Sequence, residues 1–132
     1  MDFMEIALDE ARKAYKKGEV PIGAVIIKGN KVIAKAHNLR ERKNNALAHA
    51  EVLAIDKACK KLHNWRLSGC EMYVTLEPCT MCMGAIINSR IDKVYYGAPL
   101  ENKGLNHEAA VEYMANEKCG EILRSFFEGK RA

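Results

Sequence analysis

Apolar residues recur every three or four positions over residues 4–17, which is the period of an amphipathic helix. Gly18 follows directly, and a glycine at this point is typical of a helix end. Residues 22–27 are almost wholly apolar and predict a short strand buried on both faces. A Gly-Asn pair at 29–30 predicts a turn, after which residues 31–36 return as the second strand of a hairpin. The apolar positions of the first helix are Met4, Ala7, Leu8, Ala11, Ala14 and Tyr15.

The rest of the chain alternates helical and strand patterns. Residues 40–45 are polar and predict a loop, and residues 48–62 predict a helix. A further helix is expected to begin at Pro78, because the missing N–H of proline suits a first turn, and to run to about Asn88. Strands are expected at 72–76, 93–97 and 110–113. The apolar face of the helix at 48–62 comprises Val52, Ile55, Cys59 and Leu62.

The last helix is predicted over residues 117–128, with Gly129 closing it. Its inward face is expected to comprise Cys119, Ile122, Leu123, Phe126 and Phe127. Alternating helices and strands of this kind indicate an α/β fold, in which helices cover both faces of one sheet.

Composition narrows the class of protein without deciding its function. The 132 residues suit one domain, spanning 1–132, with a substantial core. A formal net charge of +4 permits a nucleic-acid partner but does not require one. The N-terminus is acidic where a secretion signal would be basic, and no apolar stretch reaches the roughly 20 residues of a membrane span. The five cysteines are an odd number, so we expect free thiols and a cytoplasmic location.

Two short motifs carry the candidate chemistry. The first is Ala48-His49-Ala50-Glu51, and the second is Glu77-Pro78-Cys79-Thr80-Met81-Cys82. One imidazole and two thiols offer zinc three ligands and leave its fourth position open, as in a catalytic site. The pattern H-x-E followed by P-C-x-x-C is the known signature of zinc-dependent nucleobase deaminases.

The spacing within these motifs assigns different roles to their residues. Cys79 and Cys82 are three apart at a helix start, so their side chains share a face. The positive end of the helix dipole favours the thiolate that zinc requires. In a regular helix Glu51 would point about 200° away from His49, so Glu51 is expected to act as an acid or base beside the metal rather than as a ligand.

Other readings of each motif are open when it stands alone. A lone C-x-x-C is often redox-active or half of a structural zinc site, and a lone H-x-E is common by chance. Both motifs together, each at a predicted helix start, favour a catalytic zinc. We expect the remaining thiols, Cys59, Cys70 and Cys119, to be packed in the core, and the remaining histidines, His37, His63 and His107, to be surface or structural residues.

Longer stretches resemble a known family. They are residues 18–25 (GEVPIGAV), 48–51 (AHAE), 64–67 (NWRL), 75–86 (TLEPCTMCMGAI), 89–91 (SRI) and 125–127 (SFF). Together they closely resemble the bacterial tRNA adenosine deaminases, which belong to the cytidine deaminase-like superfamily. The run that starts at Thr75 is more similar to this group than to cytidine or dCMP deaminases.

The resemblance implies a three-layer α/β/α sandwich around a five-stranded mixed sheet, and conversion of adenosine to inosine at the tRNA wobble position. It implies one zinc ion per chain held by His49, Cys79 and Cys82, with Glu51 moving protons. Asn38 would hydrogen-bond the target base. The residues expected to line the substrate pocket are Val20, Ile22, Ala50 and Leu76, and those expected to approach RNA are Arg40, Phe126 and Phe127. The alternative for the two phenylalanines is core packing.

Two stretches depart from the family pattern. Residues 44–47 read Asn-Asn-Ala-Leu where the family usually has a segment containing Asp-Pro-Thr. The segment after Ala98 is shorter than usual, which leaves a link near the minimum for a crossover between parallel strands. The fifth strand is therefore expected to pair differently, to be displaced, or to follow an extended crossover.

Partners and competing functions follow from the same residues. A basic loop (Arg40, Arg42 and Lys43) and the terminal Lys130-Arg131 could track RNA phosphates or form a solvated surface. Met81, Met83, Ile86 and Ile87 cover more of one helix than a single core face requires, which predicts a homodimer. The alternative enzyme is a deaminase of a free nucleobase, nucleoside or nucleotide of the guanine, cytosine or cytidine type. A noncatalytic zinc-bearing partner subunit and a redox C-x-x-C protein are the other classes.

Overall fold

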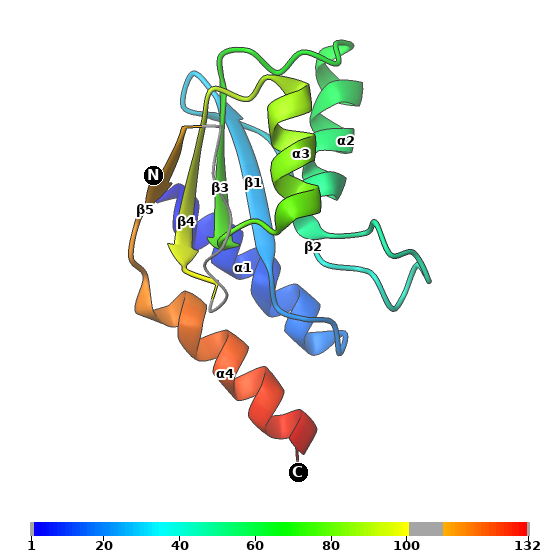
Figure 1. Cartoon of the computed structure of the whole chain (residues 1–132), viewed down its shortest axis with the longest axis vertical. Helices are drawn as coiled ribbons and strands as arrows, with labels where there is room; N and C mark the ends of the chain where they lie inside the picture. Colours follow the sequence, from blue (N-terminus) through cyan, green and yellow to red (C-terminus); the bar gives the residue numbers. More distant parts are fainter. Residues whose placement is uncertain (1, 101–109, 132) are drawn as a thin grey trace.

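The structure is a computed structural model that describes residues 2–100 and 110–131 (Figure 1). Strands and helices alternate along the chain, as the hydrophobic pattern predicts. The helices are α1 (Phe3–Lys16), α2 (Ala50–Leu62), α3 (Thr80–Ser89) and α4 (Glu117–Arg131). The strands are β1 (Gly23–Lys28), β2 (Lys31–His37), β3 (Cys70–Leu76), β4 (Lys93–Ala98) and β5 (Val111–Tyr113).

The strands form one mixed sheet in the order β2-β1-β3-β4-β5. β1 is antiparallel to both β2 and β3, whereas β3, β4 and β5 run parallel. The fifth strand is neither reversed nor detached, because Val94 pairs with Val111 and Tyr96 with Tyr113 in parallel register. The expectation of a different pairing is therefore wrong. Most of the link to this strand, residues 101–109, lies outside the described residues.

The helices cover the sheet as two layers, which gives the predicted three-layer sandwich (Figure 1). α2 and α3 lie side by side on one face and pack through small alanines and through Met83 and Ile86. α1 lies on the other face, where α4 contacts it and the end of the sheet. β1 is buried over five of its six residues because helices cover both of its faces.

Two glycines allow helices to come close to the sheet. A Cβ atom on Gly23 of β1 would lie 1.9 Å from the carbonyl oxygen of Ala7 in α1. A Cβ atom on Gly97 of β4 would lie 2.5 Å from the sulfur of Cys119 in α4. Both contacts require a residue without a side chain, so these glycines set how closely the two helices pack against the sheet.

Several local expectations need correction. The most buried positions of α2 are Ala50, Glu51, Ala54 and Ala58, not the predicted stripe, because small side chains let this helix lie close to the sheet. α3 begins at Thr80 rather than at Pro78, since Cys79 has an extended backbone. Gly129 does not end α4, which continues to Arg131. Among the described residues, no helix has both the length and the apolar character needed to cross a bilayer.

Candidate metal centre

Within residues 2–100 and 110–131, one group of metal-ligating side chains converges. The ligand atoms of His49, Cys79 and Cys82 all lie within 4.8 Å of one another. Nδ1 of His49 is 3.7 Å from the sulfur of Cys79 and 3.5 Å from that of Cys82. For tetrahedral zinc with ordinary Zn–S and Zn–N bond lengths, the expected N···S separation is about 3.6 Å. The imidazole nitrogen therefore lies about as far from each sulfur as zinc would hold it.

The backbone explains why these side chains meet. His49 is the N-cap residue of α2 and Cys79 is the N-cap residue of α3, each with an extended conformation. An N-cap side chain usually bonds to the free N–H groups of the first turn, but neither residue does so here. Both side chains are thus available to a shared ligand. Cys82, one turn further along α3, is fully buried and completes the group.

Glu51 lies beside this group without belonging to it. It occupies the first turn of α2 and is 4% exposed. The Cys82 thiol donates a hydrogen bond to the Glu51 carboxylate. Burial raises the pKa of Glu51 to about 7, against the opposing effects of its backbone and Cys82 hydrogen bonds. A carboxyl group with a pKa in this range can both accept and release a proton near neutral pH.

The electrostatics of these side chains favour a bound cation. Burial raises the pKa of the Cys82 thiol, and the neighbouring Glu51 and Cys79 raise it further. Burial also lowers the pKa of His49, and the positive charge of Arg40 adds to this effect. A divalent cation among two sulfurs and an imidazole would offset these costs, and this donor set suits zinc.

Asn38 presents a buried oxygen that the described residues leave without a partner. It follows β2, is 6% exposed, and donates its backbone N–H to the carbonyl of Ile22. Its side-chain Oδ1 has no hydrogen-bond partner among the described residues. A buried acceptor without a partner costs about 1–3 kcal/mol, so its presence calls for an explanation. A ligand N–H that enters the site would satisfy it.

A hydrogen-bonded cluster of Glu10, His37 and two exposed lysines precedes Asn38 in the chain, and the sequence pattern does not reveal it. Glu10 of α1 is 4% exposed, and its Oε1 lies 2.9 Å from Nδ1 of His37. Lys17 bonds to the other nitrogen of the same ring, and Lys13 bonds to the second oxygen of Glu10. The cluster ties the end of β2 to α1. His37 is thus structural, as expected.

A cleft of about 880 Å³ lies beside the end of β3 and under α4. Two of the predicted pocket residues, Val20 and Leu76, line it together with Phe127 and Arg124 of α4. The other two lie outside this lining. Ile22 is half-buried, and Ala50 is fully buried in the core between α2 and the sheet.

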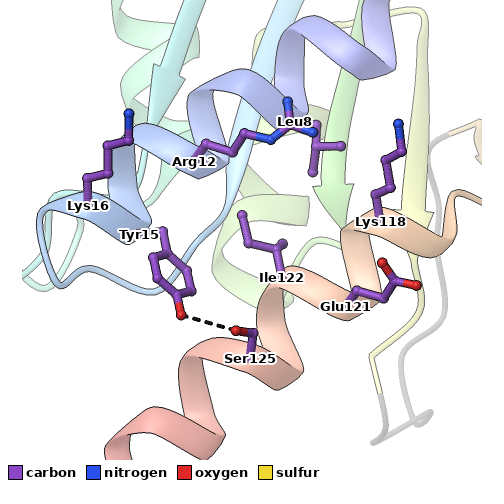
Figure 2. A pocket seen from close by; sticks show the side chains of 8 residues that line it. All are labelled: Leu8, Arg12, Tyr15, Lys16, Lys118, Glu121, Ile122 and Ser125. Atoms are coloured by element: carbon purple, nitrogen blue, oxygen red, sulfur yellow. Dashed lines mark hydrogen bonds between the residues drawn. The ribbon is translucent and has the colours of Figure 1, made fainter.

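The two phenylalanines of α4 have different surroundings. Phe126 is buried and packs edge-on against Tyr15 of α1, whereas Phe127 is 47% exposed. Tyr15 also hydrogen-bonds to Ser125, so one α1 side chain contacts two residues of α4 (Figure 2). A groove of about 470 Å³ lies between the two helices at this contact, with Leu8 and Ile122 among its lining residues. Of the pair, Phe127 is the residue whose ring is accessible to a ligand.

The other predicted residues can also be placed. Arg40 is exposed, yet it acts electrostatically on His49, a proximity that the sequence does not show. On α3, Met83 and Ile86 belong to the core, while Met81 and Ile87 remain half-buried. All five cysteines lie in the described part of the chain and all are free. Cys70 and Cys119 are buried as expected, and Cys59 is half-buried.

Comparisons with known proteins agree with this geometry. The family of MafB19-like deaminases matches residues 1–131. The tRNA-specific adenosine deaminase of Bacillus subtilis (strain 168) is 48% identical, over 95% of this chain and 86% of that protein. The corresponding protein of Aquifex aeolicus is 44% identical, over 98% of this chain and 94% of that protein.

Solved structures show the same likeness. A structure from studies of A-to-I editing by tRNA:A34 deaminases superposes with a TM-score of 0.84 at 41% identity, covering 92% of this chain and 98% of the other. The guanine deaminase of Bacillus subtilis superposes with a TM-score of 0.71 at 40% identity, covering 75% of this chain and 66% of the other. With its converging His49, Cys79 and Cys82 and these relatives, the chain belongs to the MafB19-like deaminase family, within the group of bacterial tRNA-specific adenosine deaminases.

Proposed function

We propose that this protein converts adenosine to inosine at the wobble position of tRNA. The observation that carries the proposal is the spacing of the three donor atoms, together with the buried carboxyl group of Glu51 beside them. Relatives that share nearly the whole chain are named tRNA-specific adenosine deaminases. Their activity supports the choice of substrate, and the donor geometry supports the chemistry.

The chain's own residues would divide the reaction among them. His49, Cys79 and Cys82 would hold one zinc ion, which supplies a Lewis acid that activates water. Glu51 would accept a proton from the attacking water and deliver protons to the adenine ring nitrogen and to the leaving amine. The water oxygen would first bond to C6 while the ring nitrogen gains the first proton. The C6–N bond would then break as the second proton of the water passes to the amine, and ammonia leaves. Asn38 would orient the base through its Oδ1 atom.

A direct assay separates this function from the alternatives. The purified protein would be incubated with a tRNA anticodon stem-loop containing adenosine at the wobble position, and separately with free adenosine, guanine, cytidine and cytosine. We expect inosine in the stem-loop and no change in the free compounds. Ammonia released from a free compound, with no inosine in the stem-loop, would reject the proposal.

Guanine deamination is the second candidate that a specific observation favours. A solved guanine deaminase shares 40% identity over 75% of this chain. Purine deaminases of either kind would need the same three donors and the same carboxylate. The guanine arm of the assay therefore tests this candidate directly.

RNA binding should involve the basic loop after Asn38. Arg40, Arg42 and Lys43 are exposed on this loop, and Phe127 and Arg124 face the cleft from α4. If the loop cations contact phosphates, the affinity for the stem-loop should fall with a log–log salt slope of about −0.7 per contact for single-stranded RNA. An affinity that does not depend on salt would show that these cations do not contact the RNA phosphates.

We also propose that the protein is a homodimer that uses α3. The half-buried Met81 and Ile87 lie on a helix whose other apolar residues already fill the core. Gly84 of the same helix is exposed, and a Cβ atom there would meet nothing within 4 Å. A second helix could therefore approach closely at this point. Sedimentation equilibrium of the protein and of a Met81→Lys variant tests this, and a monomeric wild type would refute it.

A further inference from the structure

A buried carboxylate joins two loops next to the site. Glu19 lies between α1 and β1 and is 1% exposed. Its Oε1 accepts the backbone N–H of Glu41 at 3.1 Å, and its Oε2 accepts the backbone N–H of Arg42 at 2.7 Å. Hydrogen bonds from N–H groups to a carboxylate are roughly twice as strong as those between neutral groups. Glu19 therefore forms a firm tie between segments that are 22 and 23 residues apart.

Glu19 provides hydrogen-bond acceptors for backbone N–H groups of the turn that have no acceptor within the turn itself. Between β2 and α2 the backbone N–H groups of Lys43, Asn44 and Asn45 bond to carbonyls within the turn. The N–H groups that precede them have no such partners, as in the first turn of a helix. Glu19 supplies acceptors for two of these groups from another segment, in the way that an N-cap side chain does. Glu19 thus contributes two of the hydrogen bonds that hold the turn in place.

This turn connects two groups of the proposed site. Asn38 lies just before it and His49 just after it, and the N–H of Leu39 bonds to the carbonyl of Ala48 at the base of the loop. The turn itself carries Arg40, Arg42 and Lys43. On the opposite side, the residue after Glu19 is Val20, which lines the cleft. One carboxylate therefore joins the segment that reaches the cleft at Val20 to the turn that connects Asn38 and His49.

We propose that Glu19 is a positioning residue, which holds the 40–45 turn so that its cations face the phosphates of the RNA substrate beside Asn38. The inference rests on the proposed function, since it names RNA as the ligand of the turn. Glu19 touches no reacting atom. Its loss should therefore raise KM for the stem-loop more than it lowers kcat.

Loss of charge and loss of positioning at Glu19 change KM for the stem-loop in opposite directions. Glu19→Gln removes a negative charge near an RNA site, which by electrostatics alone would lower KM. It also replaces one acceptor with an NH₂ group that faces a backbone N–H, so the tie loses a bond and gains a repulsive contact. If Glu19 positions the turn, KM for the stem-loop rises by about tenfold despite the lost charge.

Two control variants separate positioning from charge and from stability. Glu41→Gln removes the same charge from an exposed side chain of the turn, and its KM should fall or stay unchanged. Ile26→Val destabilises the core at a residue of β1 outside the turn, and its KM should not change at a temperature well below its Tm. All variants should bind as much zinc as the wild type.

Hydrogen exchange provides a readout that does not depend on activity. In Glu19→Gln the amides of Glu41 and Arg42 should exchange faster than in the wild type. In Ile26→Val the same two amides should exchange at the wild-type rate. Unchanged exchange at these amides, or a KM that follows the Glu41→Gln control, would overturn the inference. If the wild type forms no inosine in the stem-loop, the proposed function fails instead, and the exchange data still decide whether Glu19 holds the turn.

Discussion

Nδ1 of His49 lies 3.5 Å from the sulfur of Cys82, although 33 positions separate the two residues in the chain. The contact joins the start of α2 to the first turn of α3, and these two helices lie side by side on one face of the sheet (Figure 1). The site therefore depends on the packing of two helix starts rather than on one continuous segment.

Replacing Cys82 with alanine should remove most of the bound metal. The variant loses one of three donors, and the remaining two hold zinc weakly. Zinc content measured by mass spectrometry should fall from one ion per chain to a small fraction. Cys70→Ala is the matched control, because Cys70 is equally buried but lies outside the metal group. Equal zinc content in the two variants would contradict the assignment.

Replacing Glu51 with glutamine should abolish most activity and leave the metal in place. The amide cannot accept the proton from water, and general acid–base catalysis contributes about 10²–10⁴-fold to rate. Single-turnover assays on the stem-loop, together with zinc analysis, measure the two effects. Asp56→Asn, an exposed change on the same helix, should retain full activity. A Glu51→Gln protein with the wild-type rate would exclude the proton-transfer role.

Replacing Asn38 with alanine should impair catalysis more than stability. Loss of a hydrogen bond to the base should lower kcat/KM by about 10- to 100-fold, or about 1.4–2.7 kcal/mol. Its Oδ1 has no partner among the described residues, so the variant loses no bond of that atom within this part of the protein. Thermal unfolding should show a smaller change than the about 2–5 kcal/mol expected for a core truncation such as Ile86→Ala. The reverse order of effects would make Asn38 a purely structural residue.

The Glu10–His37 pair should stabilise the fold in a pH-dependent way. Burial acts to raise the pKa of Glu10, but hydrogen bonds from His37 and Lys13 and the positive charge of Lys13 outweigh it and hold the pKa below 4.5. A carboxyl group whose pKa is lower in the folded state stabilises that state above its unfolded pKa. This contribution disappears as the pH falls through the folded pKa.

Urea unfolding of the wild type and of Glu10→Gln, at pH 7 and at successively lower pH, tests this sign. The difference in unfolding free energy between the two proteins should be largest at pH 7 and should shrink as the pH falls below 4.5. A difference that grows on acidification would show that Glu10 does not act through its charge.

Replacing Gly97 with alanine should loosen α4. The new Cβ atom would lie 2.5 Å from the sulfur of Cys119, so the helix must shift, at a cost of about 1–3 kcal/mol. Cys119→Ala in the same chain removes that sulfur and should restore part of the loss. Gly129→Ala, in a helical position with nothing within 4 Å, should be neutral or slightly stabilising. Simple additivity of the Gly97 and Cys119 changes would contradict the contact.

The sequence predicts most of the elements because each has a clear period. The helical stripe over 4–17 and the apolar run at 22–27 match α1 and β1 within one residue at every end. Predicted element ends are wrong where a local backbone conformation decides them. At Cys79, for example, the extended backbone places the start of α3 at Thr80. The predicted buried face of α2 is wrong because small residues, rather than the most hydrophobic ones, are buried there.

The metal group is predictable because its ligands are chemically distinctive and lie at fixed spacings. The side chains that support the site, Glu10 and Glu19, are harder to predict from the sequence. Glu10 could have been noticed, because it interrupts the buried stripe of α1 between Leu8 and Ala11. The partners of Glu19 could not, because they are backbone N–H groups, which every residue except proline carries. Phe126 and Phe127 differ because neighbours in a helix point about 100° apart, so only one faces the core.

The residues assigned to chemistry all precede position 83, whereas α4 comes at the end of the chain and contacts α1, β3 and β4. Evolution can therefore alter the last helix while the machinery of bond breaking is inherited intact. Sequence changes confined to α4 therefore leave every residue assigned to the reaction unchanged.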